Sequence, residues 1–157
     1  MKKPVALVAL ALALGASAPA LAQKECSKSE AAAAEKAVDR VVNYPGLLKA
    51  WRDYGHCSQG PVGELFTEAI LRLMVEWKDV DTVAQDMGRE PNYKKFVFGH
   101  LGNAAKEDRQ SIYSRAKASC PLTQGAFCAE LIEVVKNQPA KADDLLAPLP
   151  TIPAPKK

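Results

Sequence analysis

Five side chains in this sequence are our candidates for acid–base or hydrolytic chemistry. They are the two histidines, His56 and His100, and three glutamates, Glu64, Glu68 and Glu76. Paired carboxylates can hydrolyse glycosidic bonds, so the glutamates raise the hypothesis of an envelope hydrolase. Their spacing of four and eight residues on one predicted helix is equally typical of a solvated helix face, and this is the interpretation we favour.

The histidines have ordinary structural interpretations as well. His56 lies between Gly55 and Cys57, so we expect it in a loop. His100 shares a predicted helix face with apolar neighbours, where a hydrogen-bonded histidine at the edge of the core is common. The sequence has no G-x-S-x-G nucleophile elbow. We therefore expect a protein that is not an enzyme and uses no cofactor, and we keep His100 as a candidate binding residue.

The four cysteines, Cys26, Cys57, Cys120 and Cys128, are expected to form two disulfides. Sequence alone allows three pairings. We favour Cys26 with Cys57 and Cys120 with Cys128, because shorter loops close at a lower entropic cost. There is no C-x-x-C pair and there are only two histidines, so we expect neither a structural zinc site nor covalently attached haem.

The first 22 residues have the three parts of a secretory signal peptide. Lys2 and Lys3 precede an apolar run over 5–14, and small residues lead to Ala22, where we expect cleavage. A membrane-spanning helix is the rival interpretation, but the apolar run is shorter than the roughly 20 residues that a bilayer requires. The prediction is therefore export to the periplasm or the extracellular space, with no stable membrane anchor after cleavage.

The charge pattern gives no indication of nucleic-acid binding. The whole chain has a formal net charge of +3, and loss of the signal peptide removes two lysines and no acid, which leaves +1. Basic and acidic residues also alternate closely along the chain, as in Lys106-Glu107-Asp108-Arg109. Such interleaving is typical of a solvated surface of mixed sign.

The elements that carry these residues are predicted to be helices throughout, because apolar residues recur at helical spacing and no convincing strand pattern is present. We expect a small all-α bundle of about five to seven helices, stapled by two disulfides. The predicted domains are the signal peptide (1–22), the helical domain (23–138) and a flexible Pro-rich tail (139–157). The predicted helices lie at about 27–43, 47–54, 61–77, 81–87, 91–101, 104–119 and 124–137, with the apolar third helix at the centre.

One aromatic residue falls off its predicted helix face. Phe98 is out of step with Tyr93, Phe96, Val97 and Leu101, so we expect it to be exposed and to belong to a partner surface.

These features favour an exported, non-enzymatic protein that binds another protein, such as an inhibitor or an immunity-type factor. The alternative is a helical carrier or chaperone for an apolar ligand, which the very apolar third helix suggests. An envelope hydrolase built on the glutamates and His100 is a distant third hypothesis. A pocket deep enough for a small molecule would favour the carrier, and a solid core would count against it.

Overall fold

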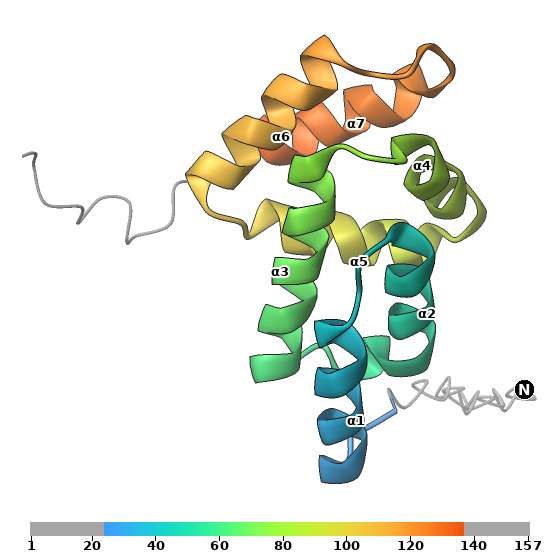
Figure 1. Cartoon of the computed structure of the whole chain (residues 1–157), viewed down its shortest axis with the longest axis vertical. Coiled ribbons are helices and arrows are strands. Elements are labelled where there is room, and N and C mark those ends of the chain that lie inside the picture. The colour runs from blue at the N-terminus through green and yellow to red at the C-terminus, as the bar shows by residue number, and fades with distance from the viewer. Residues whose placement is uncertain (1–23, 137–157) are drawn as a thin grey trace, which may run out of the picture.

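A computed structural model describes residues 24–136 and has only helices and their connections over that range (Figure 1). The all-α prediction is confirmed. The helices are α1 (Lys28–Asp39), α2 (Tyr44–Tyr54), α3 (Gly60–Glu76), α4 (Val80–Arg89), α5 (Pro91–Gly102), α6 (Lys106–Ala118) and α7 (Gly125–Lys136). Single 3₁₀ turns lie at Gly55–Cys57 and Leu122–Gln124.

Helix α3 is central, as its broad apolar stripe predicts. It packs against α1, α2, α5 and α6, while α6 and α7 form an antiparallel hairpin at one end of the molecule (Figure 1). Phe66, Ile70 and Met74 of α3 are each no more than 1% exposed. Burial of such side chains contributes roughly 1.5–3 kcal/mol each, so this packing is the main source of stability.

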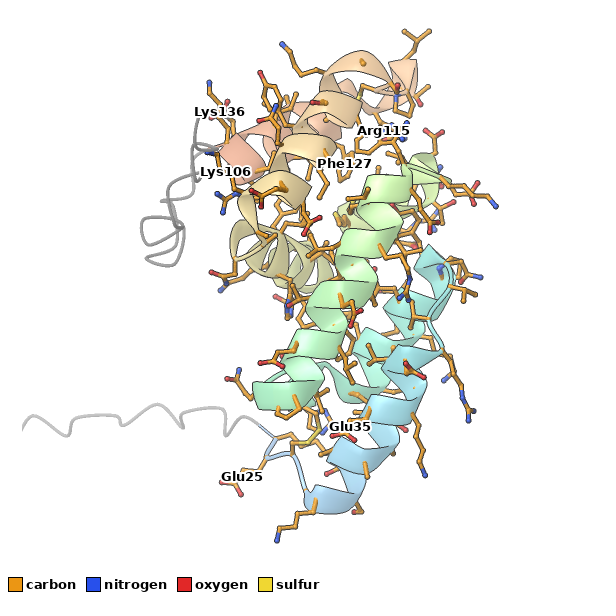
Figure 2. The ribbon with its side chains drawn as sticks, turned by 60° about the vertical axis from the view of Figure 1, so that its left-hand side comes forward. Glu25, Glu35, Lys106, Arg115, Phe127 and Lys136 are labelled. Carbon is orange, nitrogen blue, oxygen red and sulfur yellow. A yellow bond between two sulfur atoms is a disulfide. The ribbon has the colours of Figure 1, made fainter. Side chains whose placement is uncertain are left out.

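Side chains elsewhere follow the same division between inside and outside. Lys106 and Lys136 are exposed at the ends of the hairpin, whereas Phe127 of α7 is buried beneath α6 (Figure 2). The exposed positions are largely polar, which fits the mixed-sign surface that the sequence predicts.

The helix boundaries depart most from the sequence prediction at the junction of α1 and α2. Helix α1 ends at Asp39 rather than at about Asn43, because Asn43 is instead the N-cap of α2, where its side chain accepts a 2.8 Å hydrogen bond from the Gly46 N–H. Pro45 therefore lies in the first turn of α2 and does not break a helix. Gly88, predicted to end a helix, lies inside α4.

The turn between α3 and α4 uses left-handed backbone at two residues that are not glycine. Trp77 has φ 57° and Asp79 has φ 53°. The Trp77 indole N–H donates a 2.9 Å hydrogen bond to the Ser119 carbonyl oxygen, which fixes the end of α3 against the end of α6. This contact helps to hold Trp77 in a conformation that L-residues rarely adopt.

Both predicted disulfides are confirmed. Cys26 is bonded to Cys57 and Cys120 to Cys128, with Cα–Cα distances of 4.9 Å and 6.2 Å. The first bridge ties the approach to α1 to the turn after α2, and the second closes the connection between α6 and α7. The predicted signal peptide and the whole of the predicted Pro-rich tail lie outside the described residues. Within the described residues, no helix has the length and apolar character required to cross a membrane.

Candidate binding surface

Several contacts hold the segment that joins α2 to α3, which comprises residues 55–59 and the first residue of α3, Gly60, and which we call the bridging loop. It begins with the 3₁₀ turn, in which the Ser58 N–H donates to the Gly55 carbonyl at 3.3 Å. The Gln59 N–H then donates to the Cys57 carbonyl at 2.7 Å. Gly60 has φ +56°, a conformation that glycine adopts without strain.

Two further contacts hold the bridging loop from below. Cys57 is 2% exposed and bonded to Cys26, so the base of the loop is fixed to the approach to α1. The Ser58 carbonyl lies against Gly63 of α3, where a Cβ atom would stand only 2.6 Å from the carbonyl oxygen. The loop therefore rests directly on the α3 backbone, and Gln59 is left exposed at its crest.

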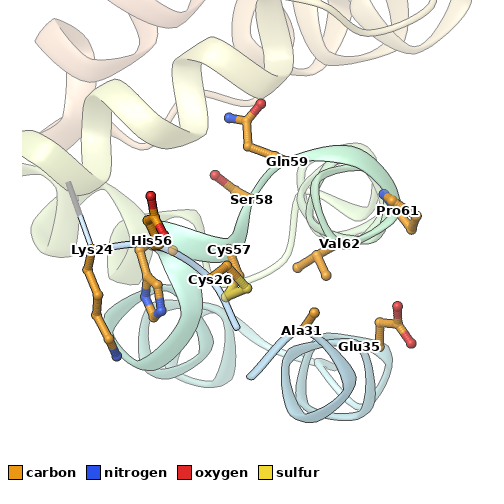
Figure 3. A pocket seen from close by; sticks show the side chains of 12 residues that line it. Lys24, Cys26, Ala31, Glu35, His56, Cys57, Ser58, Gln59, Pro61 and Val62 are labelled. Carbon is orange, nitrogen blue, oxygen red and sulfur yellow. A yellow bond between two sulfur atoms is a disulfide. The ribbon is translucent and has the colours of Figure 1, made fainter. Parts of the chain in front are cut away.

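On one side of the bridging loop is the disulfide groove, a depression of about 670 Å³. Its floor includes the Cys26–Cys57 bridge, with Ala31 of α1 and Val62 of α3 beside it (Figure 3). Ser58 and Gln59 border the groove on the side opposite to Glu35 (Figure 3). The disulfide groove is open to solvent and mostly apolar at its floor.

The predicted loop residue His56 does lie in the bridging loop, at the edge of the disulfide groove. Its side chain is 16% exposed, and its Nε2 atom is 3.4 Å from Oε1 of Glu30 without forming a hydrogen bond. Glu30 also pairs with Lys24 at 2.6 Å and completes a capping box with Ser27. The Lys24 hydrogen bond and the Ser27 hydrogen bonds lower the pKa of Glu30 to about 2.

On the other side of the bridging loop is the histidine groove, a depression of about 530 Å³. It runs between the end of α2, the bridging loop and the exposed face of α5. The side chains that line it include Trp51, Ser58, Gln59, Asn92, Lys95, Phe96 and His100. Trp51 is half-buried, with its ring centroid 5.1 Å from that of Tyr93 and 6.4 Å from that of Phe96. The groove thus has an aromatic wall and a polar rim.

His100 is half-buried in the histidine groove, at the core boundary where the sequence predicts it. Its ring makes an edge contact with Phe96, at 4.5 Å between centroids, and its Nδ1 atom is 2.7 Å from Oγ1 of Thr67. Burial lowers the pKa of His100, and no neighbouring charge contributes to the shift. His100 is therefore mostly neutral at pH 7.

Phe98 and His100, both predicted as binding residues, lie on different sides of α5. Phe98 is half-buried rather than fully exposed, because α7 covers part of it, with Phe127 at 6.4 Å between ring centroids. The Lys94 ammonium lies over its other face, 5.7 Å from the ring centroid, and also pairs with Glu130 of α7. Phe98 therefore takes part in the packing of α5 on α7, which the helix-face argument could not foresee.

The three glutamates of the hydrolase hypothesis do not form a cluster. Glu64, Glu68 and Glu76 are all exposed on α3, and none of them forms an ion pair or side-chain hydrogen bond among residues 24–136. The described part of the chain also contains no group of three histidine, cysteine or acidic side chains placed to hold a metal ion.

Several lining residues of the histidine groove were not singled out by the sequence. Trp51, Asn92, Lys95 and Gln59 are not among the binding residues that the sequence predicts. Asn92, Lys95, Phe96 and Gly99 recur at three- and four-residue spacing, so a helical projection of α5 shows that they share one side. The contribution of α2 and the bridging loop to the same groove is tertiary and has no local signature.

Fold and bridges together define the class: this is a small, disulfide-stapled all-α protein, of the kind found in oxidising, non-cytoplasmic compartments. No protein-family model, no curated protein and no solved structure matches the chain.

Proposed function

We propose that the chain is an exported, non-enzymatic protein that binds another protein, in the manner of an inhibitor or immunity-type factor. The observation that carries this proposal is the bridging loop. It is an exposed segment held by a disulfide, by its own backbone hydrogen bonds and by contact with Gly63, and an open groove lies on each side of it.

A braced loop between grooves is well suited to protein recognition. A loop already fixed in its bound conformation loses little conformational entropy when a partner orders around it, so more of the contact energy is retained as affinity. The grooves can receive side chains of the partner, and Trp51 at the wall of the histidine groove is of the residue type most enriched at interface hot spots.

Export is the second part of the proposal. The signal-peptide pattern of residues 1–22 supports export. The two disulfides, which leave no free cysteine among the described residues, support it as well. Periplasmic residence, as opposed to release from the cell, would require a Gram-negative source.

The carrier alternative has lost the feature that suggested it. The apolar stripe of α3 is covered by neighbouring helices, with Phe66 and Ile70 completely buried, so its hydrophobicity is explained by core packing. Both grooves beside the bridging loop are open to solvent, whereas a carrier site for an apolar molecule buries most of its ligand.

The test is affinity capture from an envelope extract with the oxidised mature protein as bait. Gln59→Arg places a large charged side chain on the exposed crest of the bridging loop, and Gln110→Arg makes the same change on α6, away from both grooves. We expect a stoichiometric partner that is retained by the wild type and by Gln110→Arg but lost with Gln59→Arg.

Equal retention by both variants would contradict a role for the bridging loop. Capture of no protein, together with a lipid or small molecule in the native mass spectrum, would contradict the proposed function and support the carrier.

A further inference from the structure

The histidine groove has an unbalanced charge. Among the described residues that line it, Lys95 carries a full charge at neutral pH and no aspartate or glutamate is present. The Lys95 ammonium has no ion-pair partner among residues 24–136. By contrast, Arg52 of α2 is paired with Glu90 and Lys94 of α5 is paired with Glu130.

The groove also offers hydrogen-bond donors that are not in use. The indole N–H of Trp51 has no acceptor among the described residues, and neither has the exposed side-chain amide of Asn92. The contrast is with Trp77, the other tryptophan, whose N–H is bonded to Ser119. An indole N–H can only donate, so it requires an acceptor from the ligand or from water.

His100 contributes to the same site through a fixed tautomer. The Thr67 hydroxyl donates to the Gly63 carbonyl at 2.9 Å, so its oxygen accepts from the Nδ1–H of His100 at 2.7 Å. This arrangement leaves Nε2 as the free ring atom, and it has no partner among the described residues. Protonation of Nε2 adds a further donor without disturbing the Thr67 contact.

We propose that the histidine groove binds the carboxylate of an acidic side chain, presented by an extended peptide segment of the partner protein. The Lys95 ammonium and the Trp51 N–H bind the carboxylate oxygens, and the aliphatic part of the acidic side chain packs against Phe96. Charge-assisted hydrogen bonds of this kind are the stronger ones, which suits a site with one cation and several donors. This inference rests on the proposed function and specifies the partner chemistry of one groove.

A carboxylate in the groove couples binding to proton uptake. Few charged groups lie around His100. Lys95 is on the same helix as His100, and Glu64 and Glu68, which flank Thr67 on α3, are exposed to solvent. Helix α2 and the bridging loop bring no ionisable side chain into the groove. A bound carboxylate favours protonated His100, so binding tightens as the pH falls from about 7 towards 5.5.

The experiment uses the full mature, oxidised protein and a phage library of random peptides, selected at about pH 6. Selected peptides are synthesised together with analogues in which each Asp or Glu is replaced by Asn or Gln, and binding is measured by calorimetry. We expect the peptides to contain an acidic residue whose amide analogue binds about tenfold more weakly. Lys95→Ala should weaken binding by a similar factor, whereas Lys106→Ala, which removes the same charge from exposed α6, should leave it unchanged.

The pH dependence is the second readout. Affinity should rise on acidification in the wild type and less so in His100→Gln, which keeps a hydrogen-bonding side chain beside Thr67 but does not titrate. Four outcomes would each overturn the inference. The selection could yield no peptide, or peptides without acidic residues. The amide analogues could bind as tightly as the selected peptides, or Lys95→Ala and Lys106→Ala could have equal effects on binding. The proposed function is judged separately, because the capture experiment with Gln59→Arg tests the bridging loop and does not depend on the chemistry of the groove.

Discussion

Replacement of Gly63 by alanine tests the bracing of the bridging loop directly. The added Cβ would stand 2.6 Å from the Ser58 carbonyl oxygen and 3.1 Å from its carbon, and both atoms belong to backbone that cannot rotate away. Overpacking of this kind costs about 1–3 kcal/mol, and the upper part of that range applies because the disulfide restrains the loop. Alanine recovers about 1 kcal/mol of helix propensity. The expected net loss is about 1–2 kcal/mol.

The matched control is Gly99→Ala in the interior of α5, where the added Cβ meets no atom within 4 Å. It should gain about 1 kcal/mol from the same propensity difference. The two variants should therefore differ by about 2–3 kcal/mol, or roughly 10 °C in melting temperature. Urea and thermal unfolding of the oxidised protein, followed by far-UV circular dichroism, measures both. If Gly63→Ala proved as stable as Gly99→Ala, the loop would not be held against α3 as described.

Three further predictions follow from the packing and the titrating groups. Removal of the Cys26–Cys57 bridge, with a sequence separation of 31, should lower the free energy of unfolding by about 3.7 kcal/mol according to the chain-entropy relation. Removal of the Cys120–Cys128 bridge, with a separation of 8, should lower it by about 2.5 kcal/mol. Urea unfolding of the two double alanine variants measures both losses. Tyr44→Phe should lower the free energy of unfolding by about 1 kcal/mol, because the Tyr44 hydroxyl donates to the Leu73 carbonyl at 3.0 Å. Tyr93→Phe should be neutral or stabilising, because the buried Tyr93 hydroxyl has no partner in the described residues. Equal losses of stability in the two variants would contradict this assignment. Burial lowers the pKa of His100, so the contribution of this residue to stability is complete above about pH 6.5 and is lost as the pH falls through the folded-state pKa. Unfolding measured at about pH 5 to 7 should show this loss of stability in the wild type and not in His100→Gln. The loss of stability due to protonation of Glu30 comes at lower pH, between pH 4.5 and about 2.

The fold was predictable where local chemistry determines it. Pro61 and Pro91 lie in the first turns of their helices, and the Ser27–Glu30 spacing gives a complete capping box in the structure. The disulfide pairing followed from loop closure over short separations. The error at the α1–α2 junction arose because Tyr44-Pro45-Gly46 has the composition of a turn, while the Asn43 cap makes it the first turn of a helix.

The candidate surface was less predictable because it is assembled by tertiary contacts. His100 was recognised from its own helix, but the histidine groove also needs the end of α2 and the bridging loop, which lie far from α5 in sequence. Phe98 is less exposed than predicted, for a related reason. Helical spacing shows only that Phe98 does not share a face with Tyr93, Phe96, Val97 and Leu101. It does not show whether another helix covers Phe98, and in the structure α7 covers part of it.

The two disulfides have different structural roles, and this difference supports the choice of the bridging loop as the binding element. The Cys120–Cys128 bridge closes a short connection within the α6–α7 hairpin, whose helices already pack closely along their length. The Cys26–Cys57 bridge instead fixes the 3₁₀ turn at the start of the bridging loop, outside the α-helices. The same segment is also constrained by Gly63, where even a methyl group would not fit. A connection that served only to join α2 to α3 would need neither constraint, since exposed loops tolerate mobility well. Two independent constraints on one exposed loop fix its surface shape, and this supports the proposed role of the loop in binding a partner protein.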